Sequence, residues 1–505
     1  MIQSTLLSKN VGWLFLFSFG IVMILLTLLF TKNKHFKSKE GFLLANRSVV
    51  WWLGGPSIAA SWIWAGALFV SVQQSYQQGL PGLFWFLLPN VIALLIFVFL
   101  GPRIRTKFKN GYTLPQWIHY KLQSNKVHKL YLFPFFFNQL VAITFNIFAG
   151  ATMIYLVTGI HIAVGMPVLV GIALVYSLIS GLNASIITDF VQMTLILIAC
   201  FLIVPWAVYS AGGLSAIVDG LGGVTGEFRD VFNPSVAFSF GIVTSIGLIS
   251  QTVSDQQFWQ RCFALKEKHI AKAFIFGALL FGIVPLLLSL LGFLGANPNL
   301  SIQLPPNMDP SMIGISTASQ LLPLGAVMIY VIALLGALSS TIDSGIAATA
   351  SLYSTDVVKY SLQEREAFLK QSLGKKLSQK ELECIEKINP AVLKNSRYSM
   401  IVVSIVGLLV AYGVHYITAF GVKHLFLISI SVVACVSVPT VLSLYWDRLD
   451  PKGVFWGVLI AFVVGLPNSI LASHYNNSTW NVLNSLFMIG ISTLFCLIFS
   501  KKVEK

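Results

Sequence analysis

A short polar segment interrupts a long apolar run in the second half of the chain. Residues 323–353 read PLGAVMIYVIALLGALSSTIDSGIAATASLY. On a helix, Ser340, Asp343 and Ser344 share one face, and Thr341 borders Ser344. Their hydroxyl oxygens suit a sodium ion if unwound backbone carbonyls approach from the other side. Hydroxyl residues are also common where membrane helices pack together, so the pattern leaves ion ligation and helix packing open.

Two aspartates lie inside apolar runs, where an ionised carboxylate costs about 2.5–3.5 kcal/mol on insertion scales. We therefore expect Asp343 to face the protein interior or to lie near the inner membrane edge. Asp189 lies in SIITDFVQMTLIL, near the inner end of its run. It would either guide a cation or a proton along the inward path or cap the first turn of its helix. The sequence leaves both roles open.

The elements that must position these residues are membrane-spanning helices. The chain has 505 residues, of which 56% are apolar and 10% charged, and its mean hydropathy is +0.80. A soluble domain of this length needs more charge to cover its surface, and an apolar run of about 20 residues can cross a membrane. Thirteen such runs occur, at 12–31, 50–72, 82–101, 131–157, 163–180, 185–210, 236–259, 270–295, 321–358, 398–417, 424–445, 453–472 and 481–500. We predict an all-α polytopic membrane protein with about 13 transmembrane helices, embedded in a lipid bilayer.

The basic residues lie in alternate loops. Thirty of the 33 Lys and Arg residues fall in 32–49, 102–130, 260–273, 359–397, 446–452 and 501–505. Because cytoplasmic loops carry an excess of Lys and Arg, the N-terminus is expected outside and the C-terminus in the cytoplasm, most simply in the plasma (inner) membrane. The same pattern accounts for the net charge of +15 without a nucleic-acid partner. The sequence has no HExxH, Walker or GxSxG motif, and we expect neither an enzyme nor an obligatory protein partner.

Two of the runs are interrupted by polar or helix-breaking residues. The second contains GGPSIAASWIWAGA (54–67), in which Pro56 disfavours helix at Gly55, and the seventh contains TSIGLISQTVSDQQFWQR (244–261). Backbone groups freed by a break have no water to bond in lipid, so both runs must face protein or a hydrated cavity; a simple kink also fits the second run. The two interrupted runs are five apart, which is the spacing of inverted repeats whose broken helices meet at a binding site.

These patterns divide the chain into three parts. They are an N-terminal helix and first cytoplasmic loop (1–49), a transporter core (50–445) with repeats at about 50–210 and 236–445, and two C-terminal transmembrane helices with a short cytoplasmic tail (446–505). The largest loop, 360–397, reads as a polar, helix-prone connector that ends at Asn389–Pro390. It is too short for a nucleotide-binding domain, which argues against an ATP-driven pump.

Four segments together resemble the sodium:solute symporter family, which includes sodium/glucose, sodium/proline and urea symporters. They are ASWIWAGAL (60–68), SGLNASIITDFVQ (180–192), DQQFWQR (255–261) and ALSSTIDS (337–344), in the family's order. The resemblance covers about residues 45–445, and the SWxWA stretch is most similar to the urea-transporting branch.

The resemblance implies a LeuT-type fold with an inverted-repeat core and two broken helices. It implies a sodium site with hydroxyls from Ser340 and Thr341 and carbonyls from Ala59, Trp62 and Ala337. It also implies that Asp189 lies on the ion path to the cytoplasm, close to which we expect Asp343. Solute would lie beside the sodium, lined by Ser61, Trp62, Trp64, Ser250 and Gln251.

The chain departs from the family pattern at three positions. Gly66 replaces the glutamine of the sugar carriers, which argues against a hexose. Ser61 replaces the aspartate of the proline carriers, which puts proline and their mode of coupling in doubt. Ala337 replaces a serine that some members use for a second sodium, so we expect one sodium per cycle. Some urea carriers use protons, so the family alone leaves the coupling ion open.

The function that fits best is secondary active symport of sodium, as coupling ion, with a small neutral or zwitterionic solute such as urea, a short amide, proline or another small amino acid. A proton-coupled symporter of the same fold is the first alternative. A transporter-like solute sensor is the second, although such relatives carry a fused kinase and this chain ends five residues after its last run. Arg261, the first cation in the two interrupted runs, is expected at the cytoplasmic edge, so di- and tricarboxylates would lack a partner.

Overall fold

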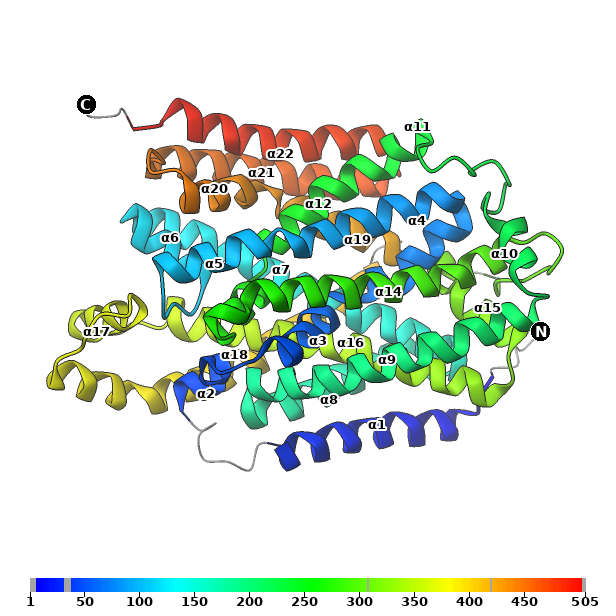
Figure 1. Ribbon diagram of the computed structural model, residues 1–505, viewed down its shortest axis with the longest axis horizontal. Coiled ribbons are helices and arrows are strands. Elements are labelled where there is room, and N and C mark those ends of the chain that lie inside the picture. Colours follow the sequence, from blue (N-terminus) through cyan, green and yellow to red (C-terminus); the bar gives the residue numbers. More distant parts are fainter. Residues whose placement is uncertain (1–5, 31–37, 307, 418–419, 502–505) are drawn as a thin grey trace.

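The computed structural model describes residues 6–30, 38–306, 308–417 and 420–501, and almost all of them are helical (Figure 1). Over these residues the structure contains no strand, only an isolated parallel bridge between Val49 and Leu265. That bridge joins the segments next to the two interrupted runs. The predicted all-α class is confirmed.

Twenty-two α-helices are named along the described residues. They are α1 Lys9–Phe30, α2 Lys39–Leu44, α3 Trp51–Trp62, α4 Ser71–Leu95, α5 Phe97–Lys107, α6 Leu114–Leu122, α7 Asn125–Thr158, α8 Ile162–Ser180, α9 Leu182–Ser210, α10 Leu214–Gly220, α11 Pro234–Val236, α12 Ile242–Val253, α13 Gln256–Ala264, α14 Ile270–Ala296, α15 Ile313–Leu321, α16 Leu324–Leu352, α17 Leu362–Ser372, α18 Gln379–Ile417, α19 Val422–Val432, α20 Ala434–Tyr445, α21 Pro451–His474 and α22 Ser478–Ile498. Short 3₁₀ or π turns adjoin them, at η2 Ala45–Arg47, η3 Gly66–Val70, η4 Ala237–Gly241, η5 Glu267–His269, η6 Pro310–Met312 and η7 Tyr353–Val357.

Twelve helical stretches of the described residues are long and apolar enough to cross a membrane. The second predicted crossing, 50–72, is not one of these stretches, because its helix is interrupted. Its first part, α3, has 12 residues and spans about 18 Å of a bilayer core about 30 Å thick. Its remainder is η3 and the start of α4, which loses helical dihedral angles at Gln78 and Gly79. If α3 with this remainder is one crossing and the rest of α4 with α5 is the next, the predicted thirteen crossings are recovered.

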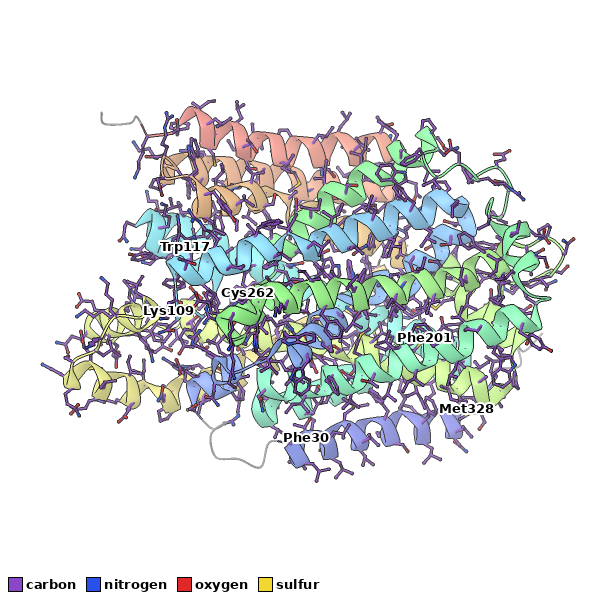
Figure 2. All side chains as sticks on the ribbon, viewed as in Figure 1. Phe30, Lys109, Trp117, Phe201, Cys262 and Met328 are labelled. Carbon is purple, nitrogen blue, oxygen red and sulfur yellow. The ribbon has the colours of Figure 1, made fainter. Side chains whose placement is uncertain are left out.

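The long axis of the molecule is the direction along which the helices run. In Figure 1, α1 begins and α22 ends at opposite ends of this axis, as an odd number of crossings requires. Helix α17 lies at the end where α22 finishes, and α10 and α15 lie at the end where α1 begins. Lys109 and Trp117, from the basic segment around α5 and α6, lie toward the α17 end (Figure 2).

The predicted end of the large loop at Asn389–Pro390 is wrong. Helix α18 runs through Pro390 without interruption, and only the shorter α17 forms a separate element in this region. Ile388 and Val392, on either side of the proline, are buried against the rest of the protein. Packing therefore holds the helix where the proline removes one backbone hydrogen bond.

Helix α16 forms the centre of the bundle. Every residue from Ala333 to Leu352 is buried, so this helix has no lipid-facing side over that length. Helices α3, α7, α8, α9, α13 and α18 all contact it. The polar segment singled out in the sequence therefore faces protein on all sides.

Candidate functional site

The first interrupted run breaks at Ile63 and Trp64. Helix α3 ends at Trp62, Ile63 has φ −84° and ψ 68°, and the helix resumes only at Ala65. Side chains from other helices bond the freed backbone groups. The amide of Ala65 donates to Asn146 Oδ1 of α7 at 2.9 Å, and the carbonyl of Ile63 accepts from Thr341 Oγ1 at 3.4 Å.

The Gly54-Gly55-Pro56 stretch is not the break, contrary to the sequence interpretation. Pro56 lies inside α3, and all three residues are buried. A Cβ on Gly55 would meet the ring of Phe276 in α14, so the glycine allows close approach of the two helices. The proline is tolerated because buried neighbours fix the helix, and the chain unwinds seven residues later, where polar partners are available.

The second interrupted run breaks at Ser254 and Asp255, between α12 and α13. Asp255 has an extended backbone (φ −101°, ψ 117°), and its carboxylate accepts from the amide of Gln257 at 2.8 Å as the cap of α13. Gln139 of α7 also donates to this carboxylate at 3.0 Å, and Ser254 donates to the carbonyl of Val433 at 3.0 Å. The predicted pair of broken helices is confirmed as geometry.

Helix α16 presents Thr341 to the first break. Thr341 Oγ1 lies 3.4 Å from the carbonyl oxygen of Ile63 and 3.4 Å from that of Ala337. The carbonyl of Ala59, another expected ligand, accepts the amide of Ile63 at 2.9 Å, and Trp62 is the last residue of α3. These oxygens are uncharged hard donors, which fit an alkali cation carried as cargo. The carbonyl of Ile63 lies next to these expected ligand oxygens, although the sequence analysis did not predict it as one of them.

Ser340 faces a different partner, the carboxylate of Asp189. Its hydroxyl donates to Asp189 Oδ1 at 2.5 Å, and Ser57 of α3 donates to Asp189 Oδ2 at 2.6 Å. Asp189 is fully buried and lies in the eighth position of α9, which begins at Leu182. The alternative of a helix cap is therefore wrong, because the carboxylate lies beyond the first turn and bonds to other helices.

Arg261 pairs with Asp189 in the interior. Its Nη2 lies 2.9 Å from Asp189 Oδ2 and 2.8 Å from Ser344 Oγ, and its Nε donates to Ser57 Oγ at 3.0 Å. Only 1% of Arg261 is exposed, so its guanidinium lies in the protein interior, a burial that the sequence analysis did not predict. Cys262, the next residue, lies within the bundle toward the α17 end (Figure 2). Helix α13 follows the break at Ser254–Asp255 and carries Arg261 to the carboxylate of Asp189.

Asp343 completes this cluster from α16. Its Oδ1 accepts from Ser185 Oγ at 2.8 Å, and its Oδ2 lies 3.4 Å from Thr188 Oγ1. Ser185 also lies 3.4 Å from Asp189 Oδ2, so one hydroxyl links the two carboxylates. Asp343 is buried as expected. When Asp189 and Asp343 are both ionised, the single guanidinium of Arg261 balances one of the two charges. One buried negative charge is then left without a partner of opposite sign.

The two tryptophans of the expected solute site pack against each other next to the first break. The rings of Trp62 and Trp64 are stacked with centroids 5.8 Å apart. Phe258 contacts Trp62, and Phe145 and Phe426 contact Trp64. Neither indole N–H has a hydrogen-bond partner in the part of the chain that the structure describes. Buried N–H groups without partners are rare, and a bound solute would satisfy them.

Ser250 and Gln251 lie on α12 close to polar groups of other helices. Gln251 Nε2 donates to Asn138 Oδ1 of α7 at 3.3 Å, and Ser250 donates to Ser437 of α20 at 3.2 Å. Gln251 Oε1 and Asn138 Nδ2 have no partner among the described residues. Asn138 was missed, although an asparagine inside the apolar run 131–157 was the signal that could have found it.

The hydroxyl of Ser61, which was expected to line the solute site, lies next to the cluster formed by Asp189, Arg261 and Asp343. Its hydroxyl donates to the carbonyl of Ser57 at 2.7 Å and lies 3.0 Å from Ser344 Oγ. The structure thus joins Ser61 to the face of α3 that contacts Asp189. The hydroxyl contacts given for Ser61 are with this cluster, whereas the Trp62–Trp64 pair is formed by residues on either side of the break.

Comparison with known proteins fits this arrangement. The sequence profile described as "Sodium:solute symporter family" matches residues 42–461. The chain belongs to the sodium:solute symporter family. The resemblance drawn from four short segments is therefore confirmed.

Relatives within the sodium:solute symporter family include urea and sugar transporters. The chain is 24% identical over 268 residues to the probable urea active transporter 1 of Schizosaccharomyces pombe, which covers 50% of this chain and 40% of that protein. It is 22% identical over 500 residues to the urea-proton symporter DUR3 of Oryza sativa subsp. japonica, covering 91% of this chain and 65% of that one. It is 24% identical over 490 residues to the sodium/glucose cotransporter 1 of Ovis aries, covering 87% and 68%.

Solved structures show that the fold of this family member is of the LeuT type. The chain superposes on a Na⁺-coupled sialic acid symporter in a substrate-bound outward-open state with a TM-score of 0.72 and 17% identity, covering 97% of this chain and 98% of that one. It also superposes on Mhp1, a nucleobase-cation-symport-1 family transporter, in a closed conformation, with a TM-score of 0.57 and 13% identity, covering 92% and 96%. The predicted inverted-repeat type of fold is confirmed.

Proposed function

We propose that this chain is a secondary active symporter that couples inward sodium flow to the uptake of a small neutral or zwitterionic organic solute. The observation that carries the proposal is the position of Thr341, whose hydroxyl lies 3.4 Å from the carbonyl of Ile63 at the helix break. In transporters with broken helices, carbonyls of the unwound backbone coordinate the sodium ion, and the Thr341 hydroxyl lies beside such a carbonyl. Ser340, Thr341 and the carbonyls of Ala59, Trp62 and Ala337 are the proposed ligand set, to which we add Ile63.

The carboxylate cluster supports cation coupling. Asp189 and Asp343 are both buried, and one guanidinium, that of Arg261, compensates one of the two charges. A buried uncompensated carboxylate is costly, and a cation passing from the Thr341 region toward the cytoplasm would neutralise it. Ser340 precedes Thr341 in α16 and donates to Asp189, so it is the group that would pass the ion from the Thr341 region to the carboxylate.

A proton is the second candidate ion, and the same cluster favours it for a specific reason. A proton shared by the two carboxylates would remove the excess negative charge as well as a sodium ion would. The rice relative is described as a urea-proton symporter. Sodium remains the first choice because the hydroxyl and carbonyl oxygens around Thr341 have no titratable group among them.

The solute class follows from the groups near the tryptophan pair. Two indole N–H groups, one amide oxygen and one amide NH₂ are buried without partners among the described residues, at Trp62, Trp64, Gln251 and Asn138. Flat apolar rings with a few neutral hydrogen-bonding groups fit urea, a short amide or a small amino acid. Arg261 is not available to a di- or tricarboxylate, because Asp189 already occupies its guanidinium.

The location follows from the charge pattern. We infer that the α17 end, which carries the basic loops, faces the cytoplasm and that the start of α1 faces outside. The protein would then act in the plasma (inner) membrane, with no obligatory protein partner, and the division into repeats at about 50–210 and 236–445 is part of this proposal.

Solute binding can be measured without transport. Because Trp62 and Trp64 are proposed to touch the solute, their fluorescence in purified protein should change on addition of solute. We expect urea, acetamide or a small amino acid to give a saturable change that is at least about tenfold tighter in sodium chloride than in choline chloride. A solute affinity that is the same in both salts, and that also does not change with pH, would contradict ion coupling. A saturable response only to glucose or citrate would contradict the proposed solute class.

A further inference from the structure

A small cavity lies between elements that are far apart in the sequence, away from the proposed sodium and solute sites. Its volume is about 120 Å³, and its lining residues come from the kink of α4, from η4 and α12, from the start of α19 and from the α21–α22 turn. They are Gln78, Ser239, Phe240, Val243, Lys423, His424, Leu427, Ser473, Asn476, Ser478 and Asn481. Next to this kink, the amide of Leu80 donates to the carbonyls of Leu221 and Phe228, in the loop that follows α10. The cavity therefore lies toward the end of the molecule where α1 begins (Figure 1).

The lining of this cavity carries a cation and no acid. Lys423 is the one lysine or arginine among the eleven lining residues, and none of the eleven is Asp or Glu. Within the described part of the chain, the Lys423 ammonium makes neither an ion pair nor a hydrogen bond. A partly buried ammonium without a counter-charge attracts an anion.

Among the neutral groups of the cavity, Gln78 Oε1 is a buried acceptor without a partner in the described residues, whereas Asn476 and Ser473 can donate. His424 Nδ1 accepts the amide of Gly421 at 3.2 Å, so its Nε2 carries the hydrogen and donates to Asn476 Oδ1 at 2.8 Å. This bond fixes the orientation of the Asn476 amide and leaves its NH₂ group to donate. Ser473 is 1% exposed, and its hydroxyl has no partner among the described residues. The cavity thus offers an ammonium, an amide NH₂ and a hydroxyl.

We propose that this cavity binds one small monovalent anion, a halide or a single carboxylate group, on Lys423, Ser473 and Asn476. On this measure a single water needs about 10–15 Å³, so the cavity has room for chloride, formate or acetate together with a few waters. The inference does not depend on the proposed coupling ion, because it concerns a different set of residues.

The cavity lies one aromatic layer away from the tryptophan pair. Phe240, which lines it, stacks on Phe426 with centroids 6.3 Å apart, and Phe426 lies 5.5 Å from the ring of Trp64. A bound anion would hold η4, α19 and the α21–α22 turn together over this layer. Its source is either the salt of the medium or the carboxylate of a zwitterionic solute that waits outside the layer.

The experiment uses the purified full chain in detergent and chloride as the probe. Acetylation of Lys423 by an amine-reactive reagent is followed by mass spectrometry in sodium chloride and in sodium gluconate, with the exposed Lys9 as the internal control. We expect chloride to slow the modification of Lys423 at least about threefold and to leave Lys9 unchanged. Equal rates at Lys423 in both salts would overturn the proposal.

Variants give a second measurement of the same site. Chloride affinity, from the broadening of the ³⁵Cl resonance, should fall about tenfold in Lys423→Gln and remain within twofold of the wild type in Lys9→Gln, because one charge-assisted bond is lost. Ser473→Ala should weaken binding less, and it replaces Lys423→Gln if that variant does not fold. Unchanged affinity in both cavity variants would overturn the proposal.

Uptake then distinguishes the two sources of the anion. If the occupant is inorganic, replacing chloride by gluconate slows the uptake of neutral and zwitterionic solutes alike, and Lys423→Gln removes this difference. If the occupant is the solute carboxylate, Lys423→Gln raises KM for zwitterionic solutes about tenfold and leaves KM for urea or acetamide unchanged. If neither effect occurs, an anion in this cavity has no role in transport, and the proposal that the site serves transport is overturned.

Discussion

The buried pair between Asp189 and Arg261 makes the strongest quantitative prediction. Replacing one member of a buried ion pair typically costs about 3–5 kcal/mol, because the other charge remains without compensation. Here the two single replacements are not equivalent, since Asp343 lies in the same cluster and Ser344 contacts both Asp343 and Arg261. Asp189→Asn leaves one carboxylate and one guanidinium, whereas Arg261→Gln leaves two carboxylates and no cation.

We therefore expect Arg261→Gln to lower the free energy of unfolding by about 3–5 kcal/mol and Asp189→Asn by about 1–3 kcal/mol. In Asp189→Asn/Arg261→Gln, the loss should be smaller than the sum of the single losses by at least about 1 kcal/mol, because the cluster then carries one charge fewer than in Arg261→Gln. The assay is denaturant unfolding of the purified protein in mild detergent micelles, followed by tryptophan fluorescence, for all four proteins.

Two results would refute this reasoning. Losses that add within about 0.5 kcal/mol would mean that the residues act independently despite the 2.9 Å contact. A greater loss in Asp189→Asn than in Arg261→Gln would mean that Asp343 does not share the guanidinium.

In transport, Asp189→Asn should slow turnover more than it weakens solute binding, since the carboxylate is proposed to lie on the ion path.

Three further perturbations test other parts of the structure. Thr341→Ala should raise the sodium concentration for half-maximal uptake about tenfold, whereas Thr349→Ala, whose hydroxyl bonds only within the same helix, should not change it; equal shifts would contradict the ligand assignment. Trp64→Ala should weaken solute affinity and leave sodium affinity nearly intact, as measured by uptake at varied solute and sodium, and equal loss of both would mean that Trp64 supports the fold. Burial lowers the pKa of the Lys39 ammonium from 10.5 to about 7. Between these two pH values the unfolded state binds more protons than the folded state, so thermal stability should rise with pH over this range. Lys39→Met should flatten that rise, and an unchanged slope would show that the ammonium is hydrated in the folded protein.

The fold was accessible from the sequence because lipid imposes a simple rule. Each crossing needs about 20 apolar residues and an internally bonded backbone, so run length and loop charge were enough for the class and the number of crossings. Where packing decides instead, the sequence interpretation failed. The chain crosses Pro390 and Pro56 as helix, and it unwinds at Ile63–Trp64, where Asn146 and Thr341 supply partners.

The site was accessible only in part, because charge placement depends on tertiary structure. Hydroxyls and carboxylates in apolar runs pointed to α9 and α16, and both aspartates are buried together. Arg261 looked like a loop residue, since it follows a polar stretch and begins a basic segment. Its contact with Asp189 spans 72 positions and cannot be read from local sequence.

Solute uptake into proteoliposomes tests the central claim most directly. Radiolabelled urea, acetamide and a small amino acid would be supplied under an inward sodium gradient, under an inward proton gradient and with neither, to the wild type and to Ser340→Ala/Thr341→Ala. We predict accumulation above the external concentration under the sodium gradient for at least one of these solutes, and its loss in the double variant. Accumulation driven only by the proton gradient, or sodium-driven accumulation that survives in the double variant, would contradict the account.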